Sequence, residues 1–147
     1  MTAEALARRS AAAILAGDRV ARWLGTEIVD AGPGRAAIRM PVTEAMVNGL
    51  GTVHGGVVFT LADIALAVAC NSHGETTVSR GAEVIHLAPA HPGDVLVATA
   101  EERWRDGRNG VYDVTVQREG GGVVAEFRGQ SRTIGGRLVP EEGPASG

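Results

Sequence analysis

Residues 56–71 read GVVFTLADIALAVACN, and this stretch decides the fold. On a helix built from it, apolar side chains fall on nearly every face and not on a single stripe. A helix of that kind is normally surrounded by protein on most sides. The apolar run is shorter than the ~20 residues that a membrane span needs, and Asp63 stands near its middle. The sequence therefore predicts one long helix buried within a domain.

The elements around this helix are expected to be mostly strands. Residues 3–24 are rich in Ala and predict one or two amphipathic helices, with a break at Gly17. Residues 26–31 and 35–40 predict a hairpin, because a Gly-Pro-Gly turn separates them, and residues 41–53 predict a loop. After the helix, β-branched residues and the turn signals Asp-Gly, Asn-Gly and Gly-Gly-Gly predict four more strands. These strands are expected over residues 77–87, 94–104, 110–118 and 122–132.

The order of these elements predicts the architecture. Two strands, one buried helix and four antiparallel strands pack together only if a single sheet curls round the helix. This is an α+β arrangement, and it resembles the hotdog fold. We expect residues 1–24 to pack on the domain as a helical segment, residues 25–137 to form the domain, and residues 138–147 to be a frayed tail.

Composition and charge argue against several classes of protein. The net charge of −3 and the pI near 5.8 disfavour a nucleic-acid-binding protein and a polybasic membrane binder. The single cysteine, Cys70, excludes an internal disulfide and a multi-cysteine zinc site, and the four histidines show no metal-ligand spacing. The N-terminus lacks the pattern of a secretory signal, and a lone cysteine fits a reducing compartment. We therefore expect a cytoplasmic protein without a metal site.

Asp63 is the first candidate for chemistry. Its neighbours are Leu61, Ala62, Ile64 and Ala65, and no cationic residue lies within one helical turn. A carboxylate in such a setting is costly unless it is paired or faces a cavity. Buried carboxylates frequently act as acids, bases or nucleophiles. The alternative is that Asp63 lies on a solvated helix face or pairs with a distant arginine.

The second candidate is the sequence TVHGG at residues 52–56, directly before the buried helix. The first amide groups of a helix have no partner within the helix and carry positive potential. Two glycines let a substrate approach these amides, which then form a hole for a carbonyl oxygen that becomes an oxyanion. The alternative is a plain loop in which His54 makes local hydrogen bonds.

The spacing of the two candidates predicts a dimer. Gly55 and Asp63 are eight residues apart, which is roughly 12 Å along a helix at ~1.5 Å per residue. An oxyanion donor and an attacking group must both lie about 3 Å from the atoms of one carbonyl. If both residues are catalytic, Asp63 must act with Gly55 of another subunit. We therefore expect an antiparallel dimer with two equivalent sites.

Two further clusters carry weaker signals. Cys70 and His73 have the residue types of a nucleophile and a base, but this spacing at a helix end favours a core cysteine. Arg103, Arg105 and Arg108 surround one hairpin turn. That turn is either a solvated tip or a binding site for a diphosphate.

The stretch NGLGTVHGGVVFTLADIALAVACNSHG at residues 48–74 closely resembles the PaaI-type acyl-CoA thioesterases of the hotdog superfamily. Further matches follow in the same order, and together they cover most of residues 24–136. They are LAPAHPGD at 87–94, GRNGVYDVTV at 107–116 and FRGQSRTIGG at 127–136. The resemblance implies hydrolysis of phenylacetyl-CoA and its ring-hydroxylated relatives in phenylacetate degradation.

The resemblance also implies roles for single residues. Asp63 matches the carboxylate that acts as nucleophile or general base, and Gly55 matches the amide that polarises the thioester carbonyl. Asn48 and His54 match positions that bind or orient the thioester. The implied substrate-binding positions are Ser79, Gly56, His86, Pro89, Arg105 and Arg108, of which the two arginines would meet CoA. His86 departs from the family pattern, which has an aromatic or apolar residue before Leu-x-Pro.

The expected function is an acyl-CoA thioesterase with a preference for aromatic acyl groups and no cofactor. The dimer is needed for the site, and a dimer of dimers is expected. A thioester carbonyl receives weak resonance donation from sulfur and a thiolate leaves readily, so an oxyanion hole and one carboxylate can suffice. Two alternatives are a hotdog enoyl-CoA hydratase or dehydratase, which would use a histidine, and a non-catalytic acyl-CoA-binding protein. Release of the CoA thiol separates these alternatives from a thioesterase.

Overall fold

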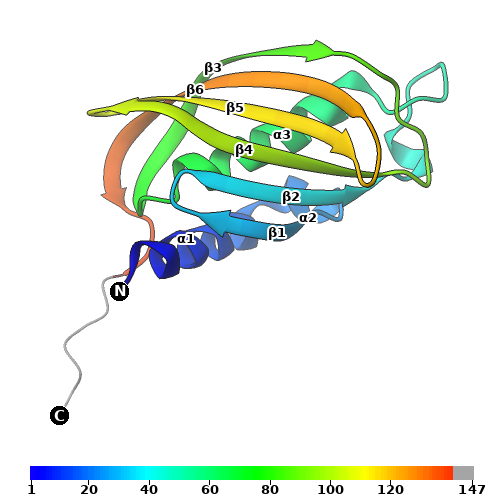
Figure 1. Ribbon diagram of the computed structural model, residues 1–147. Helices are drawn as coiled ribbons and strands as arrows, with labels where there is room; N and C mark the ends of the chain where they lie inside the picture. The colour runs from blue at the N-terminus through cyan, green and yellow to red at the C-terminus, as the bar shows by residue number, and fades with distance from the viewer. Residues whose placement is uncertain (141–147) are drawn as a thin grey trace.

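Helix α3 (Gly55–Cys70) runs through the centre of the molecule (Figure 1). The structure is a computed structural model, and it describes residues 1–140. The side chain of His54 caps the start of α3, and Asn71 ends the helix by donating its side-chain amide to the Ala67 carbonyl at 2.9 Å. Nine residues of α3 are buried. The predicted buried helix is confirmed, with both ends one residue earlier than expected.

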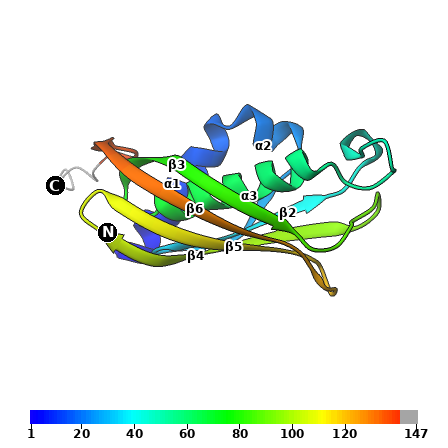
Figure 2. The ribbon, with the colours of Figure 1, turned by 90° about the horizontal axis from the view of Figure 1, so that it is seen from above.

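Six antiparallel strands form one sheet that curls round α3 (Figures 1 and 2). The order across the sheet is β1-β2-β4-β5-β6-β3. The strands are β1 (Glu27–Gly32), β2 (Arg35–Pro41), β3 (Glu75–His86), β4 (Val95–Asp106), β5 (Asn109–Arg118) and β6 (Val123–Arg137). Inside the predicted loop, Glu44–Met46 forms one short 3-10 helix, η1. The expected α+β hotdog arrangement is confirmed.

Strand β3 does not pair with β2 or β4, its neighbours in the sequence. It lies at the edge of the sheet, beside β6. Its first residues pair with the last residues of β6, as in Thr77 with Thr133 and Glu75 with Arg137. This pairing extends β6 beyond the end predicted at residue 132, because the extra length depends on a partner far away in the sequence. Within residues 1–140, no second strand covers the outer edge of β3.

Small and aliphatic side chains fill the space between the sheet and α3, as the low aromatic content requires. Phe59 of α3 and Phe127 of β6 add one edge-to-face ring contact, with ring centroids 5.2 Å apart. A Cβ atom on Gly129 would lie 2.5 Å from a Leu66 methyl group, so β6 approaches α3 closely at that point. The fully covered core side chains from the sheet include Ile38, Met40, Leu96, Ala98, Val114, Val116 and Ala125.

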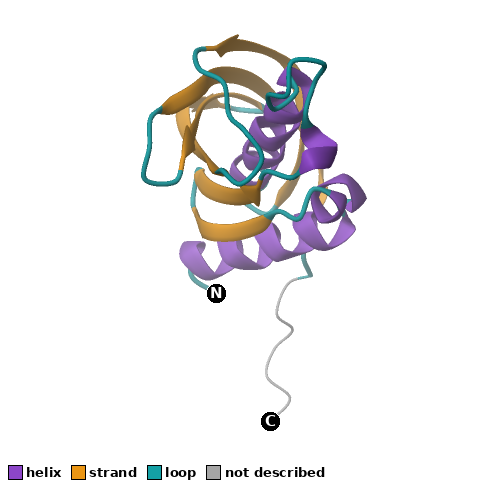
Figure 3. Cartoon of the chain, turned by 90° about the vertical axis from the view of Figure 1, so that its right-hand side faces the viewer, coloured by secondary structure: helices purple, strands orange, loops and turns teal. Residues whose placement is uncertain are grey.

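Two helices precede the sheet; the first packs against β1 and α3, and the second packs against the first (Figure 3). They are α1 (Ala3–Gly17) and α2 (Arg19–Trp23), so the predicted break at Gly17 is confirmed. Asp18 stands between them, and its carboxylate caps α2 by accepting a hydrogen bond from the Ala21 amide at 2.9 Å. This hydrogen bond therefore stabilises the α1–α2 junction.

The chain stays packed just beyond β6. The Leu138 amide donates to the Gly74 carbonyl at 2.9 Å, and Val139 is buried. The predicted frayed tail therefore does not begin at Leu138, because these two residues cover the α3–β3 turn. The rest of that prediction, residues 141–147, lies outside the described residues. Of the helices described, none combines the length and the apolar character that crossing a membrane would require.

Candidate active site

The start of α3 opens into a pocket of about 350 Å³. Its walls come from the loop before α3, from the first turns of the helix, and from the connection that follows β3. Four of the residues predicted from the sequence line it, namely Asn48, Gly55, His86 and Pro89. The fold therefore brings together four predicted residues of which the first and last, Asn48 and Pro89, lie 41 positions apart in the chain.

His54 determines which amide of α3 is available. Its Nδ1 atom accepts a hydrogen bond from the Gly56 amide at 2.9 Å. In a neutral imidazole the remaining hydrogen is then on Nε2. The Gly56 amide is thus occupied, whereas the Gly55 amide is the first of the helix and has no acceptor within it. Gly55 is therefore the residue whose amide can donate to a carbonyl oxygen. His54 makes a local hydrogen bond, as expected if this segment were a plain loop.

Asn48 shapes the loop that walls this pocket. Its Oδ1 atom accepts hydrogen bonds from the Leu50 amide at 2.9 Å and the Thr52 amide at 3.2 Å. Its Nδ2 atom lies 3.0 Å from Thr52 Oγ1. The amide side chain therefore has its hydrogen bonds within the loop, and Asn48 helps to form the pocket by holding residues 48–52 in place.

Asp63 lies in a different pocket, of about 560 Å³, together with Ser79. The carboxyl group is partly buried, and burial raises its pKa; the nearby charge of Asp18 raises it further. Asp18 and Arg19, at the α1–α2 junction, line the same pocket. Sequence reasoning did not assign these two residues to the site, because the Gly17 break indicates only where a helix ends and not what lies against it.

The two pockets share no lining residue. Within one chain, Gly55 and Asp63 stand on the same helix, roughly 12 Å apart along its axis. The structure therefore keeps the predicted oxyanion donor and the predicted carboxylate apart. One carbonyl group cannot contact both residues of a single chain.

Arg105 and Arg108 line a third, small cavity near the carboxyl end of α3. Arg105 Nε lies 3.0 Å from Glu102 Oε1, and the same oxygen accepts a hydrogen bond from Tyr112 at 3.0 Å. Burial, followed by the effect of Glu102, raises the pKa of Tyr112, so this phenol stays protonated. Part of the charge of Arg105 is thus balanced inside the protein, whereas Arg108 is exposed at the hairpin turn.

Cys70 belongs to the core. Its side chain is 3% exposed, and burial raises the pKa of the thiol to about 12. A thiol with that pKa carries very little thiolate near neutral pH, and the thiolate is the nucleophilic form. The core interpretation of Cys70 therefore fits its surroundings better than a nucleophilic one.

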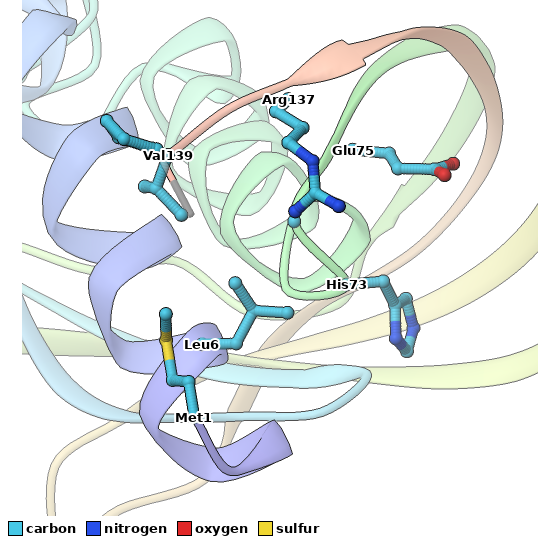
Figure 4. A pocket seen from close by; sticks show the side chains of 8 residues that line it. Met1, Leu6, His73, Glu75, Arg137 and Val139 are labelled. Atoms are coloured by element: carbon cyan, nitrogen blue, oxygen red, sulfur yellow. The ribbon is translucent and has the colours of Figure 1, made fainter. Parts of the chain in front are cut away.

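A further pocket, of about 470 Å³, lies between the start of α1, the α3–β3 turn and the end of β6 (Figure 4). Met1, Leu6, His73, Glu75 and Arg137 are among its lining residues, and of the candidates considered from the sequence it contains His73 alone. Across residues 1–140, no group of three or more His, Cys, Asp or Glu side chains is placed to hold a metal ion.

Known proteins resemble this chain in sequence and in fold. A model of the family described as "Thioesterase superfamily" matches residues 50–125. The acyl-coenzyme A thioesterase PaaI of Escherichia coli is 40% identical over 133 residues, which are 90% of this chain and 95% of that relative. The solved structure of the E. coli PaaI protein superposes with a TM-score of 0.90 at 39% identity, over 92% of this chain and 99% of that chain.

A second solved structure bears on the ligand. It is a thioesterase protein of Streptococcus pneumoniae determined with coenzyme A. Its TM-score is 0.73 at 25% identity, and the match covers 76% of this chain and 90% of that chain.

Proposed function

This chain belongs to the thioesterase superfamily and is an acyl-CoA thioesterase, and we propose that it hydrolyses aromatic acyl-CoA thioesters in sites shared between two copies of the chain. The substrates in this proposal are phenylacetyl-CoA and hydroxyphenylacetyl-CoA. The products are the free acid and CoA. The observation that carries the proposal is that Gly55 and Asp63 open into separate pockets of one chain.

The exposed edge of β3 supports a shared site. Its outer backbone groups have no strand partner within residues 1–140, and Val78 and Ile85 are exposed on this strand. An open strand edge is a template for pairing with another chain. Pairing of β3 with β3 of a second copy would run the two α3 helices antiparallel and bring the Gly55 pocket of one chain toward the Asp63 pocket of the other. A further pairing of dimers would give the homotetramer.

The chemistry follows from the two pockets. The Gly55 amide donates a hydrogen bond to the thioester oxygen, and an oxygen nucleophile adds to the carbonyl carbon while the π electrons of the carbonyl move to its oxygen. Collapse of this intermediate breaks the C–S bond and releases the CoA thiolate, which takes up a proton.

Asp63 supplies the nucleophile in one of two ways. The carboxylate either takes a proton from an attacking water molecule or adds to the carbonyl itself, and water then hydrolyses the mixed anhydride. In ¹⁸O-labelled water, label in the Asp63 carboxyl group would identify the anhydride, formed when water attacks the aspartyl carbonyl; trapping of the anhydride by hydroxylamine would identify it when water attacks the acyl carbonyl.

The wall of the Asp63 pocket supports an aromatic acyl group. Ile14, Val20, Leu66 and Val78 line it with apolar atoms, and its volume of about 560 Å³ leaves room for a ring. The E. coli PaaI structure is described as coming from the phenylacetic acid degradation operon. The pocket has room for an arylacetyl group, and the origin of the E. coli relative favours such a group over long acyl chains.

The hairpin arginines are the proposed contacts of the CoA phosphates, with Arg108 as the exposed one. The coenzyme A in the S. pneumoniae relative supports CoA as the common part of the substrate. Ser79 and Pro89 complete the proposed substrate contacts, Ser79 beside Asp63 and Pro89 beside Gly55. The single buried cysteine is consistent with a cytoplasmic location.

A thiol-release assay with pure protein tests the proposal. Phenylacetyl-CoA and 4-hydroxyphenylacetyl-CoA should be hydrolysed with kcat/KM at least tenfold above acetyl-CoA and palmitoyl-CoA. Asp63→Asn should lower kcat at least ~100-fold without changing the oligomer size. The proposal fails if aliphatic substrates are preferred. It also fails if enoyl-CoA absorbance changes without release of thiol.

A further inference from the structure

His86 stands beside the proposed oxyanion donor. It is the last residue of β3, and its exposed side chain lies over the first residue of α3. A Cβ atom on Gly55 would lie 3.2 Å from His86 Nε2 and 3.3 Å from Cε1. A ring nitrogen therefore faces the part of the helix at which the thioester oxygen would sit.

The distance allows Gly55 and His86 to hold the same oxygen. In any residue the backbone nitrogen lies about 2.5 Å from Cβ, so His86 Nε2 is at most about 5.7 Å from the Gly55 nitrogen. Two donors can each lie about 2.9 Å from one acceptor when they are no more than about 5.8 Å apart. The Gly55 amide and His86 Nε2 meet this condition without movement of the backbone.

The His86 ring also has no hydrogen-bond partner within this pocket, so a ring N–H can donate to a ligand. The polar side chains lining it are Asn48, Thr52 and His86. Asn48 and Thr52 hydrogen-bond to each other within the loop. Within residues 1–140, the His86 ring makes no hydrogen bond to another residue.

We propose that His86 is a catalytic residue whose Nε2–H donates a second hydrogen bond to the oxygen of the tetrahedral intermediate, beside the Gly55 amide. This inference rests on the proposed thioester hydrolysis. As the nucleophile bonds to the carbonyl carbon, the carbonyl π pair moves to the oxygen, and both donors hold the new charge. The C–S bond then breaks and the carbonyl re-forms, so His86 keeps its proton throughout.

Substitutions at this position can separate the ring from its hydrogen-bond donor. A phenylalanine would supply a flat ring beside Gly55 but no N–H or O–H group that could donate to an oxyanion. Histidine keeps the ring and adds the donor. A His86→Phe variant therefore removes the donor while keeping the shape, and His86→Gln keeps a donor nitrogen while losing the ring.

The test compares kcat and KM of these two variants on the best aromatic acyl-CoA. His86→Phe should lower kcat about 10- to 100-fold with KM within threefold of wild type, because one donor to the oxyanion is lost. His86→Gln should keep a kcat at least threefold above that of His86→Phe. Millimolar imidazole should raise the kcat of His86→Ala, which has an opening where the ring was.

Three results would overturn the inference while the wild-type enzyme remains an active thioesterase. They are a kcat of His86→Phe above one fifth of wild type, a His86→Gln variant as slow as His86→Phe, and an effect confined to KM. Any of these would make His86 part of the pocket wall only. A wild-type protein that releases no thiol would overturn the proposed function, and this inference with it.

Discussion

Two variants that are each inactive, Gly55→Pro and Asp63→Asn, should restore activity to one another when they share a dimer. Gly55→Pro removes the amide hydrogen that we propose polarises the carbonyl, and Asp63→Asn removes the carboxylate. If one site takes Gly55 from one chain and Asp63 from its partner, a mixed dimer has one site with both defects and one site with neither. That intact site should turn over at the wild-type rate.

The structure indicates that the proline is tolerated. Gly55 is the first residue of α3, the position at which proline is favoured in helices. His54, which precedes it, has φ −60° and ψ 133°, an extended conformation that a following proline requires. Gly55→Ala is the matched control. It adds the same Cβ atom, 3.2 Å from the exposed His86 ring, but keeps the amide hydrogen.

The size of the recovery follows from the geometry. Random mixing makes half of the dimers mixed, and each mixed dimer has one intact site of two, so activity should reach about a quarter of wild type. Mixed dimers isolated through two different tags should reach about half. The assay is thiol release after coexpression, and each parent variant alone should stay below a few per cent of wild type.

Activity of isolated mixed dimers no higher than in the parents would refute the shared site. The 12 Å between Gly55 and Asp63 along α3 would then require that one of them be dropped from the mechanism. A Gly55→Ala variant as inactive as Gly55→Pro would contradict the assigned role of the amide hydrogen. Crowding of the new Cβ atom against His86 would then account for the inactivity of both variants.

Three further predictions concern the substrate, the pH profile and the stability. Arg108→Ala should raise KM at least fivefold for an acyl-CoA and less than twofold for the matching pantetheine thioester, because the short substrate lacks the nucleotide phosphates. Asp18→Asn, which keeps the cap of α2, should move the acid limb of the kcat/KM profile to lower pH, since removing a negative neighbour lowers the pKa of Asp63. Gly129→Ala should lower the free energy of unfolding by about 1–3 kcal/mol in urea denaturation, because its Cβ would lie 2.5 Å from a Leu66 methyl group.

Two of these predictions have a control variant in the same chain, and each has an outcome that would contradict it. Arg8→Ala, at an exposed site of α1, should leave both KM values unchanged. Equal KM effects of Arg108→Ala on the two substrates would indicate that the hairpin turn is solvated and does not bind the CoA phosphates. An unshifted or upward-shifted acid limb in Asp18→Asn would contradict the electrostatic coupling to Asp63. Gly49→Ala, where a Cβ would meet nothing within 4 Å, should change the unfolding free energy by less than about 0.5 kcal/mol.

The sequence predicts those features that depend on local pattern. The uninterrupted apolar run of α3 indicates a helix that a sheet must enclose, and the Gly-Pro-Gly turn indicates the β1–β2 hairpin. Asp63 and Gly55 stand out because a lone carboxylate and a pair of glycines are conspicuous in such a run. The resulting architecture is the one observed.

Features that depend on contacts between distant parts of the chain could not be predicted from the sequence. The end of β6 is set by pairing with β3, and no periodicity within β6 reveals that partner. The place of Asp18 beside Asp63 depends on how α1 packs on the sheet, which a break at Gly17 does not specify. His86 marks an exception in the family pattern, but only the fold puts its ring over Gly55.

The curled sheet accounts for the two-chain site that we propose. Because the sheet and the N-terminal helices cover most of α3, the helix meets open pockets at its first turn and along the side that carries Asp63. The pocket at the first turn offers hydrogen-bond donors and contains no carboxylate among its walls, whereas the other pocket offers carboxylates and no part of the helix start. In the proposed mechanism, each pocket therefore supplies half of the groups that act on the thioester. Association of two chains would assemble the complete site, so dissociation of the dimer should abolish thioester hydrolysis.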